Sequence, residues 1–162
     1  HALQSLLSTK RIVRDGSTFR RPTHRPKLPP ADAKLWDRMR PLIDEGATRP
    51  PRVGELAEQL RLPVQSIQGT LDRVCTAGEA YRVAPNRCYL RVHLRALADI
   101  AQQLAEASAD ASFSAVAFKD TTGIGRNLTI EVLEFFDRAG LTKRRGNSRS
   151  MVATADDVFG AA

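Results

Sequence analysis

Residues 118–151 read FKDTTGIGRNLTIEVLEFFDRAGLTKRRGNSRSM, and this stretch decides the fold. After the paired glycines, apolar residues recur at helical spacing and would bury one face of a helix that ends at Gly140, a typical left-handed cap. The stripe consists of Leu128, Val132, Phe135, Phe136 and Ala139. The basic segment that follows contains a Gly146-Asn147 turn, which favours two short strands closing a hairpin. A turn, a helix and a basic hairpin in this order predict the second half of a helix-turn-helix with a wing.

The same order of elements occurs upstream, which indicates a repeat. Leu71, Val74 and Gly78 precede Leu133, Phe136 and Gly140 by a constant 62 residues. Leu3, Leu6 and Leu7 precede Leu71, Val74 and Cys75 by 68 residues. One partial and two complete units are therefore expected. The fold class that follows is mainly α with small β wings, arranged as tandem winged-helix (helix-turn-helix) domains.

The repeats divide the chain into five parts. Residues 1–21 are expected to be the helix end and wing of a truncated winged-helix domain, because Asp15-Gly16 lies between β-prone runs. Residues 22–30 read as a linker rich in Pro and Arg. Residues 31–92 and 93–154 are the two complete winged-helix domains. Residues 155–162 have little to pack and are expected to form a flexible tail, and the abrupt start favours a fragment of a longer protein.

Local signals place the elements of the domain at 31–92. Asp32 can cap a helix whose apolar stripe includes Trp36, a core residue by its position. Pro50-Pro51 breaks the chain before a short helix at 53–60, and Pro63 suits the first turn of the next helix. Strands are expected at 80–83 and 88–92.

The domain at 93–154 begins with a helix whose stripe is Leu94, Leu97, Ile100, Ala101 and Leu104. Ser112 or Ser114 is expected to open a short second helix that runs through Phe118, and residues 123–125 turn into the third helix.

Net charge is +7, which favours a polyanionic partner such as nucleic acid, although a solvated basic surface is the plainer explanation. Lys and Arg outnumber Asp and Glu by 17 to 9 in residues 1–92, whereas residues 93–162 hold 8 against 9. Within this nearly neutral part, Lys143, Arg144, Arg145 and Arg149 gather on the expected wing. The positive charges of the last domain are therefore concentrated on its wing.

The helix after the glycine turn carries Glu131, Glu134 and Asp137 at i, i+3 and i+6. These carboxylates would line its exposed length and repel phosphates, so it should not lie lengthwise in a groove. Its N-terminus is the better contact, because backbone N–H groups there bind anions.

Side chains and backbone at that N-terminus suit RNA better than duplex DNA. Gly125 permits close approach, and Arg126 and Asn127 add donors. A helix start beside a basic wing can grip backbone phosphates and unstacked loop bases of an RNA hairpin. Plain turn and cap chemistry is a second reading for Gly123 and Gly125, and both readings can hold together.

Several classes of function find no support in the sequence. Cys75 and Cys88 cannot form a metal site by themselves, and Cys75 falls on an apolar stripe, which favours a small buried thiol over a disulfide partner. A reducing cytoplasm fits this usage. No run of 18 apolar residues and no signal-like start occurs. The three histidines are scattered, paired carboxylates in a cleft are not indicated, and the phosphate-binding Gly-x-x-x-x-Gly-Lys-Ser/Thr motif is absent, so no catalysis is expected.

Two stretches carry a resemblance to a known family. FKDTTGIGRN at 118–127, continued by LEFFDRAGLTKRRGN at 133–147, resembles the last winged-helix domain of the bacterial selenocysteine-specific elongation factors, the SelB family. The preceding repeat is similar through AKLW at 33–36, PL at 41–42, PP at 50–51 and VGELA at 53–57. The resemblance covers most of residues 34–151.

The resemblance implies a role in translation. In that family an N-terminal GTPase carries selenocysteinyl-tRNA, and four C-terminal winged helices reach the selenocysteine insertion (SECIS) hairpin of the mRNA. This chain would hold the end of the second winged helix and the third and fourth. It would bind the mRNA hairpin and so tether selenocysteinyl-tRNA delivery to the UGA codon on the ribosome. No cofactor is then expected here, since GTP and Mg²⁺ belong to the N-terminal part. A monomeric, cytoplasmic protein without a membrane partner is expected.

The resemblance also implies the residues that contact RNA. They are Lys119, Gly123, Ile124, Gly125, Arg126 and Asn127 around the turn, and Lys143, Arg144, Arg145, Asn147 and Arg149 on the wing. Family members often have Ser or Cys at position 124 or 125, Lys at 127 and Asp at 147, and these departures bear on base contacts more than on backbone contacts. Asp120 is expected to orient Lys119 or Arg126 by a charged hydrogen bond.

Two other functions remain open from the residues alone. A winged-helix DNA-binding module of a transcriptional regulator would need basic or amide residues along its recognition helix. Gln65, Gln68 and Arg73 are compatible with that in the domain at 31–92. The same domain lacks a basic wing cluster and could instead be a protein-interaction or spacer module, although Arg82, Arg87 and Arg91 keep a backbone-binding role open.

Overall fold

The computed structural model of the chain describes residues 13–15, 18–20 and 27–161. The helix turns expected around Leu3–Leu7 and most of the linker expected at 22–30 lie outside these residues. The chain divides into two compact units. The first unit is Arg25–Leu94, and the second unit combines Arg95–Ala162 with His1–His24. Each unit is described separately below.

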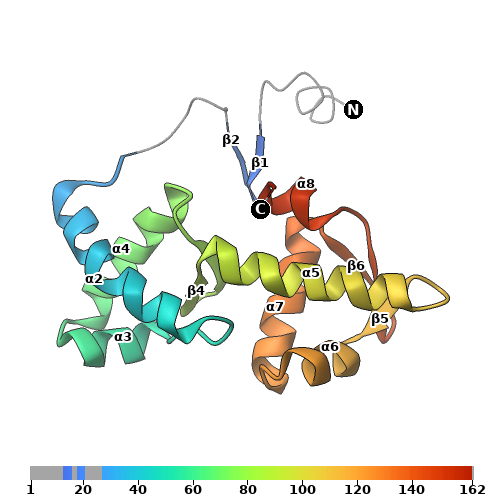
Figure 1. Ribbon diagram of the computed structural model, residues 1–162. Helices are drawn as coiled ribbons and strands as arrows, with labels where there is room; N and C mark the ends of the chain where they lie inside the picture. Colours follow the sequence, from blue (N-terminus) through green and yellow to red (C-terminus); the bar gives the residue numbers. More distant parts are fainter. Residues whose placement is uncertain (1–12, 16–17, 21–26, 162) are drawn as a thin grey trace. The chain divides into compact units, whose positions relative to one another are not determined.

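The first unit has three helices followed by a hairpin (Figure 1). They are α2 (Pro30–Gly46), α3 (Val53–Leu60), α4 (Val64–Thr76), β3 (Tyr81–Ala84) and β4 (Arg87–Tyr89). Three of its fully buried side chains are Met39 on α2, Leu56 on α3 and Ile67 on α4, and Trp36 lies in the same core as expected. Three helices and a two-stranded wing are the winged-helix order.

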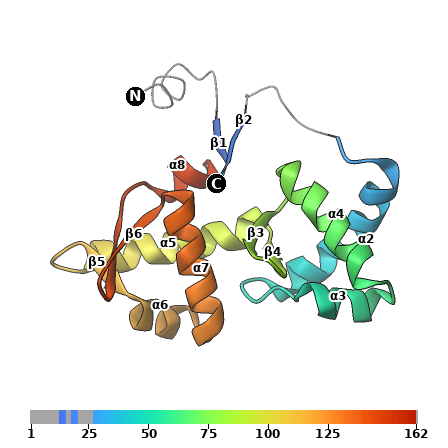
Figure 2. The same cartoon turned by 180° about the vertical axis from the view of Figure 1, so that it is seen from behind.

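The second unit repeats this order with one more strand and one more helix. Its elements are α5 (Arg91–Ala107, which begins in the first unit), β5 (Ser112–Ser114), α6 (Ala115–Thr122), α7 (Arg126–Ala139), β6 (Thr142–Arg145), β7 (Ser148–Met151) and α8 (Ala155–Phe159). The hairpin expected around Asp15-Gly16 is present as β1 (Val13–Asp15) paired with β2 (Thr18–Arg20), and β1 lies beside α8 (Figure 2). The 62-residue repeat is confirmed at the level of elements, because α3 and α6, and also α4 and α7, begin 62 residues apart.

The sheet differs between the two repeats. In the second unit β5, β7 and β6 form an antiparallel sheet in that order, whereas the described part of the first unit pairs only β3 with β4. Pro50 and Pro51 stand where β5 would fall by the repeat, and proline has no N–H to donate to a strand. Side chains of β4 bind this segment instead, since Arg87 Nη1 donates to Pro50 O (2.7 Å) and Tyr89 Oη donates to Thr48 O (2.8 Å).

Several expected element bounds are wrong. The strand expected to reach Val92 ends at Tyr89, because α5 already starts at Arg91. The strand β5 was not foreseen. Of the two serines proposed to open α6, Ser114 is the cap, since its Oγ accepts from Ala117 N at 3.1 Å. The helix then runs beyond Phe118 to Thr122.

Asp32 does not cap α2, which begins at Pro30. Its carboxylate is buried and joins α2 to α4 instead. Thr70 Oγ1 donates to it at 2.7 Å, and Arg73 donates through Nε at 2.6 Å and Nη2 at 2.9 Å. The hydrogen bonds from Arg73, followed by the one from Thr70, lower the pKa of Asp32 below its ordinary value of 3.8.

This lowered pKa predicts a pH-dependent contribution to stability. Because the folded-state pKa of Asp32 lies below the unfolded value of 3.8, its contribution is present above that value and is lost as the pH falls through the folded pKa. Asp32→Asn should therefore lower the Tm most at neutral pH, and the difference from the native chain should shrink below about pH 4. Thermal unfolding monitored by circular dichroism across pH measures this. Asp37→Asn, on the exposed face of α2, is the control, and a Tm difference that is constant with pH would contradict the assignment.

The flexible tail expected at 155–162 is a further correction, because α8 packs into the core. Ala155, Val158 and Phe159 are buried, and the Phe159 ring lies 6.5 Å from that of Phe135 and 6.2 Å from that of Phe136. Arg95 on α5 also binds Asp156 and the Gly160 carbonyl. Ala155, Val158 and Phe159 follow a helical i, i+3, i+4 spacing, but a segment of five residues is too short for this pattern to stand out in the sequence.

The packing of α8 predicts that its apolar residues contribute to stability. Val158→Ala removes two buried methyl groups from a fully buried side chain and should lower the free energy of unfolding by about 2 kcal/mol. Val152→Ala makes the same chemical change at a side chain that is 55% exposed and should change it by less than about 0.5 kcal/mol. Urea unfolding of both variants measures the difference. Equal effects would mean that α8 does not pack as described.

Candidate nucleic-acid interface

The turn before α7 depends on two glycines with positive φ. Gly123 has φ +68° and Gly125 has φ +86°, conformations that L-residues with a side chain rarely adopt. A Cβ added at either position would meet no described atom within 4 Å. The backbone conformation therefore explains why both positions are glycine, in agreement with the interpretation of Gly123 and Gly125 as turn and cap residues. The open space beside them also leaves the turn accessible to a ligand.

The start of α7 presents backbone donors and positive charge. No described side chain caps it, and its first turn, RNLT at 126–129, contains no acidic residue. Arg126 and Asn127 are exposed, and Thr129 Oγ1 donates to Gly125 O at 2.7 Å, which holds the turn against the helix. Uncapped N–H groups and the helix dipole favour an anion at such an end.

The structure adds detail to the roles expected for two residues near the turn, Ile124 and Asp120. Ile124 is only 5% exposed, so its side chain belongs to the core and only its backbone can face a ligand. The contact implied for Ile124 therefore stays a prediction for its backbone. Asp120 Oδ1 lies 3.3 Å from Lys119 Nζ, so of the two partners expected for Asp120 the structure pairs it with Lys119. Both side chains are substantially exposed, which leaves the lysine able to exchange this partner for a phosphate.

The wing is a tight hairpin with cations on both faces. Residues 142–145 of β6 pair with residues 151–148 of β7, and Gly146 at the tip has φ +61°. Lys143, Arg144, Arg145 and Asn147 are exposed, and Arg144 Nε donates to Gly146 O at 3.0 Å. Since side chains alternate along a strand, Lys143 and Arg145 lie on one face and Arg144 on the other.

Arg149 is not part of the exposed cluster, which corrects the expected contact set. It is 7% exposed, and its Nε and Nη2 lie 3.1–3.2 Å from the carboxylate of Asp137 on α7. Thr142 Oγ1 donates to the same carboxylate at 2.6 Å. Arg149 therefore fastens the wing to α7.

The same contacts change the interpretation of the acidic row on α7. Asp137 is tied to Arg149 and Thr142, and Glu131 is half-buried. Of the three carboxylates, only Glu134 stands fully exposed. The helix is less negative along its surface than the sequence indicated, so the argument against lengthwise docking is weaker than expected.

Sequence inspection missed the polar face of the three-stranded sheet. Residues directly opposite each other share a face, and the register aligns Ser112, Ser150 and Lys143 in one row and Ser114, Ser148 and Arg145 in the next. Hydroxyl groups thus surround the two cations on the outer face. These rows of polar side chains include residues of β5, so they could be predicted only if β5 had been recognised as a strand.

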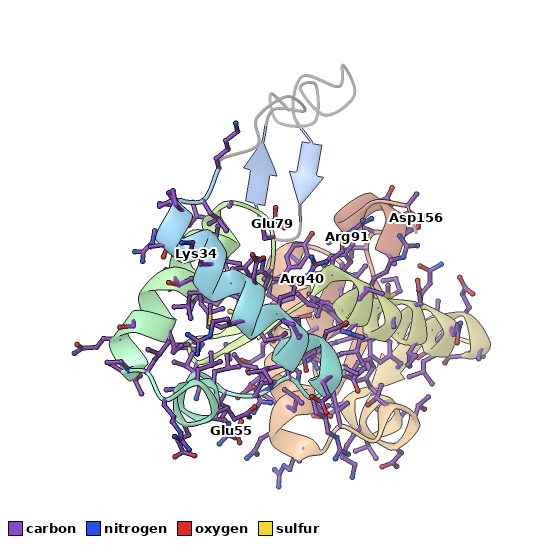
Figure 3. All side chains as sticks on the ribbon, turned by 60° about the vertical axis from the view of Figure 1, so that its left-hand side comes forward. Lys34, Arg40, Glu55, Glu79, Arg91 and Asp156 are labelled. Atoms are coloured by element: carbon purple, nitrogen blue, oxygen red, sulfur yellow. The ribbon has the colours of Figure 1, made fainter. Side chains whose placement is uncertain are left out.

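The glycine turn and the wing are connected through α6. It contacts both α7 and β5, and β5 pairs with β7 of the wing; Figures 1 and 2 show α6 beside the lower end of α7. Acidic side chains such as Glu55 on α3 and Asp156 on α8 also point outward (Figure 3), so the chain's surface carries both signs and the positive region is local. Over the described residues, no group of three His, Cys, Asp or Glu side chains could hold a metal ion, and no helix could cross a membrane.

Comparison with known proteins identifies the domain that carries this site. A family model described as elongation factor SelB, winged helix, matches residues 105–151. Residues 105–151 are therefore similar to the winged-helix domain of elongation factor SelB. The matched range contains the glycine turn, α7 and the wing, so every candidate contact residue lies inside it.

Relatives extend the similarity over most of the chain. The chain is 29% identical over 126 residues, 78% of its length, to the selenocysteine-specific elongation factor of Escherichia coli strain K12. It is 22% identical over 147 residues, 91% of its length, to that of Haemophilus influenzae. These matches span 20% and 23% of the two SelB proteins, so the chain corresponds to about a fifth of their length.

A solved structure of the SelB family shares the fold. The mRNA-binding domain of elongation factor SelB from E. coli, determined in complex with SECIS RNA, matches with a TM-score of 0.70 and 28% sequence identity. The match covers 76% of this chain and 98% of the other. The expected tandem winged-helix fold is therefore confirmed, and so is the resemblance to the SelB winged-helix region.

Proposed function

We propose that this chain binds a SECIS-type hairpin in mRNA through the start of α7 and the wing of the second unit. The observation that carries the proposal is that residues 105–151, the range matched by the SelB winged-helix model, contain both an uncapped, open helix start and three exposed cations. The similar E. coli domain was determined with SECIS RNA, which supports the same ligand here.

The geometry favours backbone and loop contacts over groove reading. The exposed backbone around Gly123 and Gly125 suits a phosphate, and Arg126 and Asn127 flank it with donors for a looped-out base. Lys119 lies beside the same turn, because its carbonyl accepts from Gly123 N at 2.8 Å, and Lys143, Arg144, Arg145 and Asn147 would supply the second contact.

The proposal extends to the longer protein that such a chain would serve. Within it, a GTPase part holding GTP and Mg²⁺ would carry selenocysteinyl-tRNA, and hairpin binding here would keep that tRNA near the UGA codon on the ribosome. We propose a cytoplasmic monomer in which this part performs no catalysis. The similarity to two selenocysteine-specific elongation factors supports this context.

An electrophoretic shift series tests the proposal directly. The chain is titrated against a SECIS hairpin, the same stem with its loop replaced, and duplex DNA of equal length. We expect the hairpin to bind at least about tenfold more tightly than either control at physiological salt. Equal affinity for duplex DNA would favour the transcriptional-regulator alternative, which the comparisons do not support.

Substitution of Asn127 should separate base contacts from phosphate contacts. Asn127→Ala removes an amide that can pair with a base edge, so binding should weaken by roughly 5- to 10-fold and preference for the native loop base should decline. The salt slope should stay unchanged, because no charge is lost. Binding of loop-base variants at several salt concentrations checks both parts. A uniform loss across all loops would assign Asn127 to the backbone.

A further inference from the structure

The only two cysteines of the chain lie against each other in the first unit. Cys75 Sγ on α4 and Cys88 Sγ on β4 are 3.4 Å apart, although the sequence favoured an isolated buried thiol. Both are free thiols. Cys88 is buried at 2% exposure, and Cys75 is half-buried, so an oxidant can reach one sulfur while the other stays protected.

The pair occupies the same junction that an ion pair closes in the second unit. Asp137 lies 62 residues after Cys75, which is the offset of the repeat, and it lies in the last turn of α7 as Cys75 lies in the last turn of α4. Arg149 is buried on β7, as Cys88 is on β4. The contact between helix and wing therefore includes Asp137 and Arg149 in one repeat, and the two sulfurs together with the Asp72–Arg82 ion pair in the other.

The surroundings favour ionisation of one sulfur. The hydrogen bond between the two sulfurs lowers the pKa of Cys88 and raises that of Cys75, and the charge of the Arg82 guanidinium acts to lower both pKa values. Arg82 itself is held by Asp72 and by Pro85 O at 2.7 Å. A thiolate held beside a reachable thiol is the arrangement in which thiol–disulfide chemistry proceeds.

We propose that Cys75 and Cys88 form a reversible disulfide that clamps α4 to the wing of the first unit. A hydroperoxide oxidises one of the two sulfurs to a sulfenic acid and is reduced to water or the corresponding alcohol. The other sulfur then attacks the sulfenic sulfur, the S–O bond breaks, and the departing hydroxide takes the remaining thiol proton and leaves as water. A dithiol reductant reverses the reaction by exchange. Bond formation shortens the 3.4 Å contact to about 2.05 Å, a change within reach of side-chain rotation.

Oxidation of the intact chain with hydrogen peroxide tests the proposal. After a short exposure, mass spectrometry should show the loss of two hydrogens, maleimide labelling of the subsequently denatured chain should fall from two thiols to none, and the chain should stay monomeric on a non-reducing gel. The rate should not depend on protein concentration. Dithiothreitol should restore both thiols. The closed loop should raise the Tm of the oxidised chain by roughly 10 °C.

Matched variants keep the outcome interpretable. Cys75→Ser and Cys88→Ser each retain one thiol and should show neither the loss of two hydrogens nor the rise in Tm, and the double variant fixes the baseline of a chain without thiols. Two labelled thiols remaining in the native chain, oxygen adducts without loss of hydrogen, or cross-linked dimers would each overturn the proposal. The readouts involve no RNA, so they are independent of the proposed hairpin binding.

Discussion

Replacing Arg144 and Arg145 together by Ala should weaken binding of the SECIS hairpin by roughly 10- to 100-fold at physiological salt. Both side chains are exposed at the wing, and β-strand alternation places them on opposite faces, so each can meet a different phosphate. The slope of log affinity against log salt should become shallower by about 1.4 to 1.8, since each lost phosphate contact removes roughly 0.7 to 0.9. A filter-binding titration at several salt concentrations provides both numbers.

The control for this experiment removes the same charge elsewhere. Lys34 and Arg40 are exposed on α2 of the first unit (Figure 3), so the Lys34→Ala, Arg40→Ala double variant also loses two positive charges. It should change the affinity less than about threefold, because it affects only the long-range field. If the two double variants weaken binding equally, the wing is not a contact and net charge alone drives association.

Arg149→Ala should lower the free energy of unfolding by about 3 kcal/mol, because it leaves Asp137 partly buried without its ion-pair partner. Lys143→Ala on the same hairpin should change it by less than about 0.5 kcal/mol, since its side chain is exposed. Chemical denaturation of the two variants and of an Asp137→Ala, Arg149→Ala double variant gives the coupling energy. The double variant should recover part of the loss.

The binding behaviour of the same variants distinguishes structure from contact. At a temperature where Arg149→Ala stays folded, its salt slope should equal that of the native chain, whereas Lys143→Ala should lower the slope. A reduced slope without loss of stability in Arg149→Ala would restore the contact role that the resemblance implied. Loss of stability with an unchanged slope agrees with the buried ion pair.

The sequence predicted the parts of this fold that depend on periodic burial and turn chemistry. Gly140 and Gly146 marked real turns with positive φ, and the repeat located four helices because the same stripe recurs. It could not predict α8, whose burial depends on Phe135 and Phe136 arriving from elsewhere in the chain. Nor could it predict β5, whose three residues pair only with a distant strand.

The location of the candidate site was predictable from the sequence, but which of its charged side chains are exposed was not. Arg144 and Arg149 look alike in the sequence, and only the fold shows that one is exposed while the other is buried against a carboxylate. A cation's availability depends on its partner, and a partner twelve residues away on another element leaves no local signal. The contact between Cys75 and Cys88 escaped detection for the same reason.

One consequence follows from the two ends of α7. The helix begins at the glycine turn and, near its other end, holds the wing through Asp137, so a single helix of 14 residues sets the spacing between the two proposed RNA contacts. Each residue of an α-helix adds about 1.5 Å of rise and about 100° of rotation. Inserting or deleting one residue in α7 would therefore rotate the wing about the helix axis relative to the glycine turn. Natural variants of this domain should therefore tolerate exchanges along α7 far better than changes in its length.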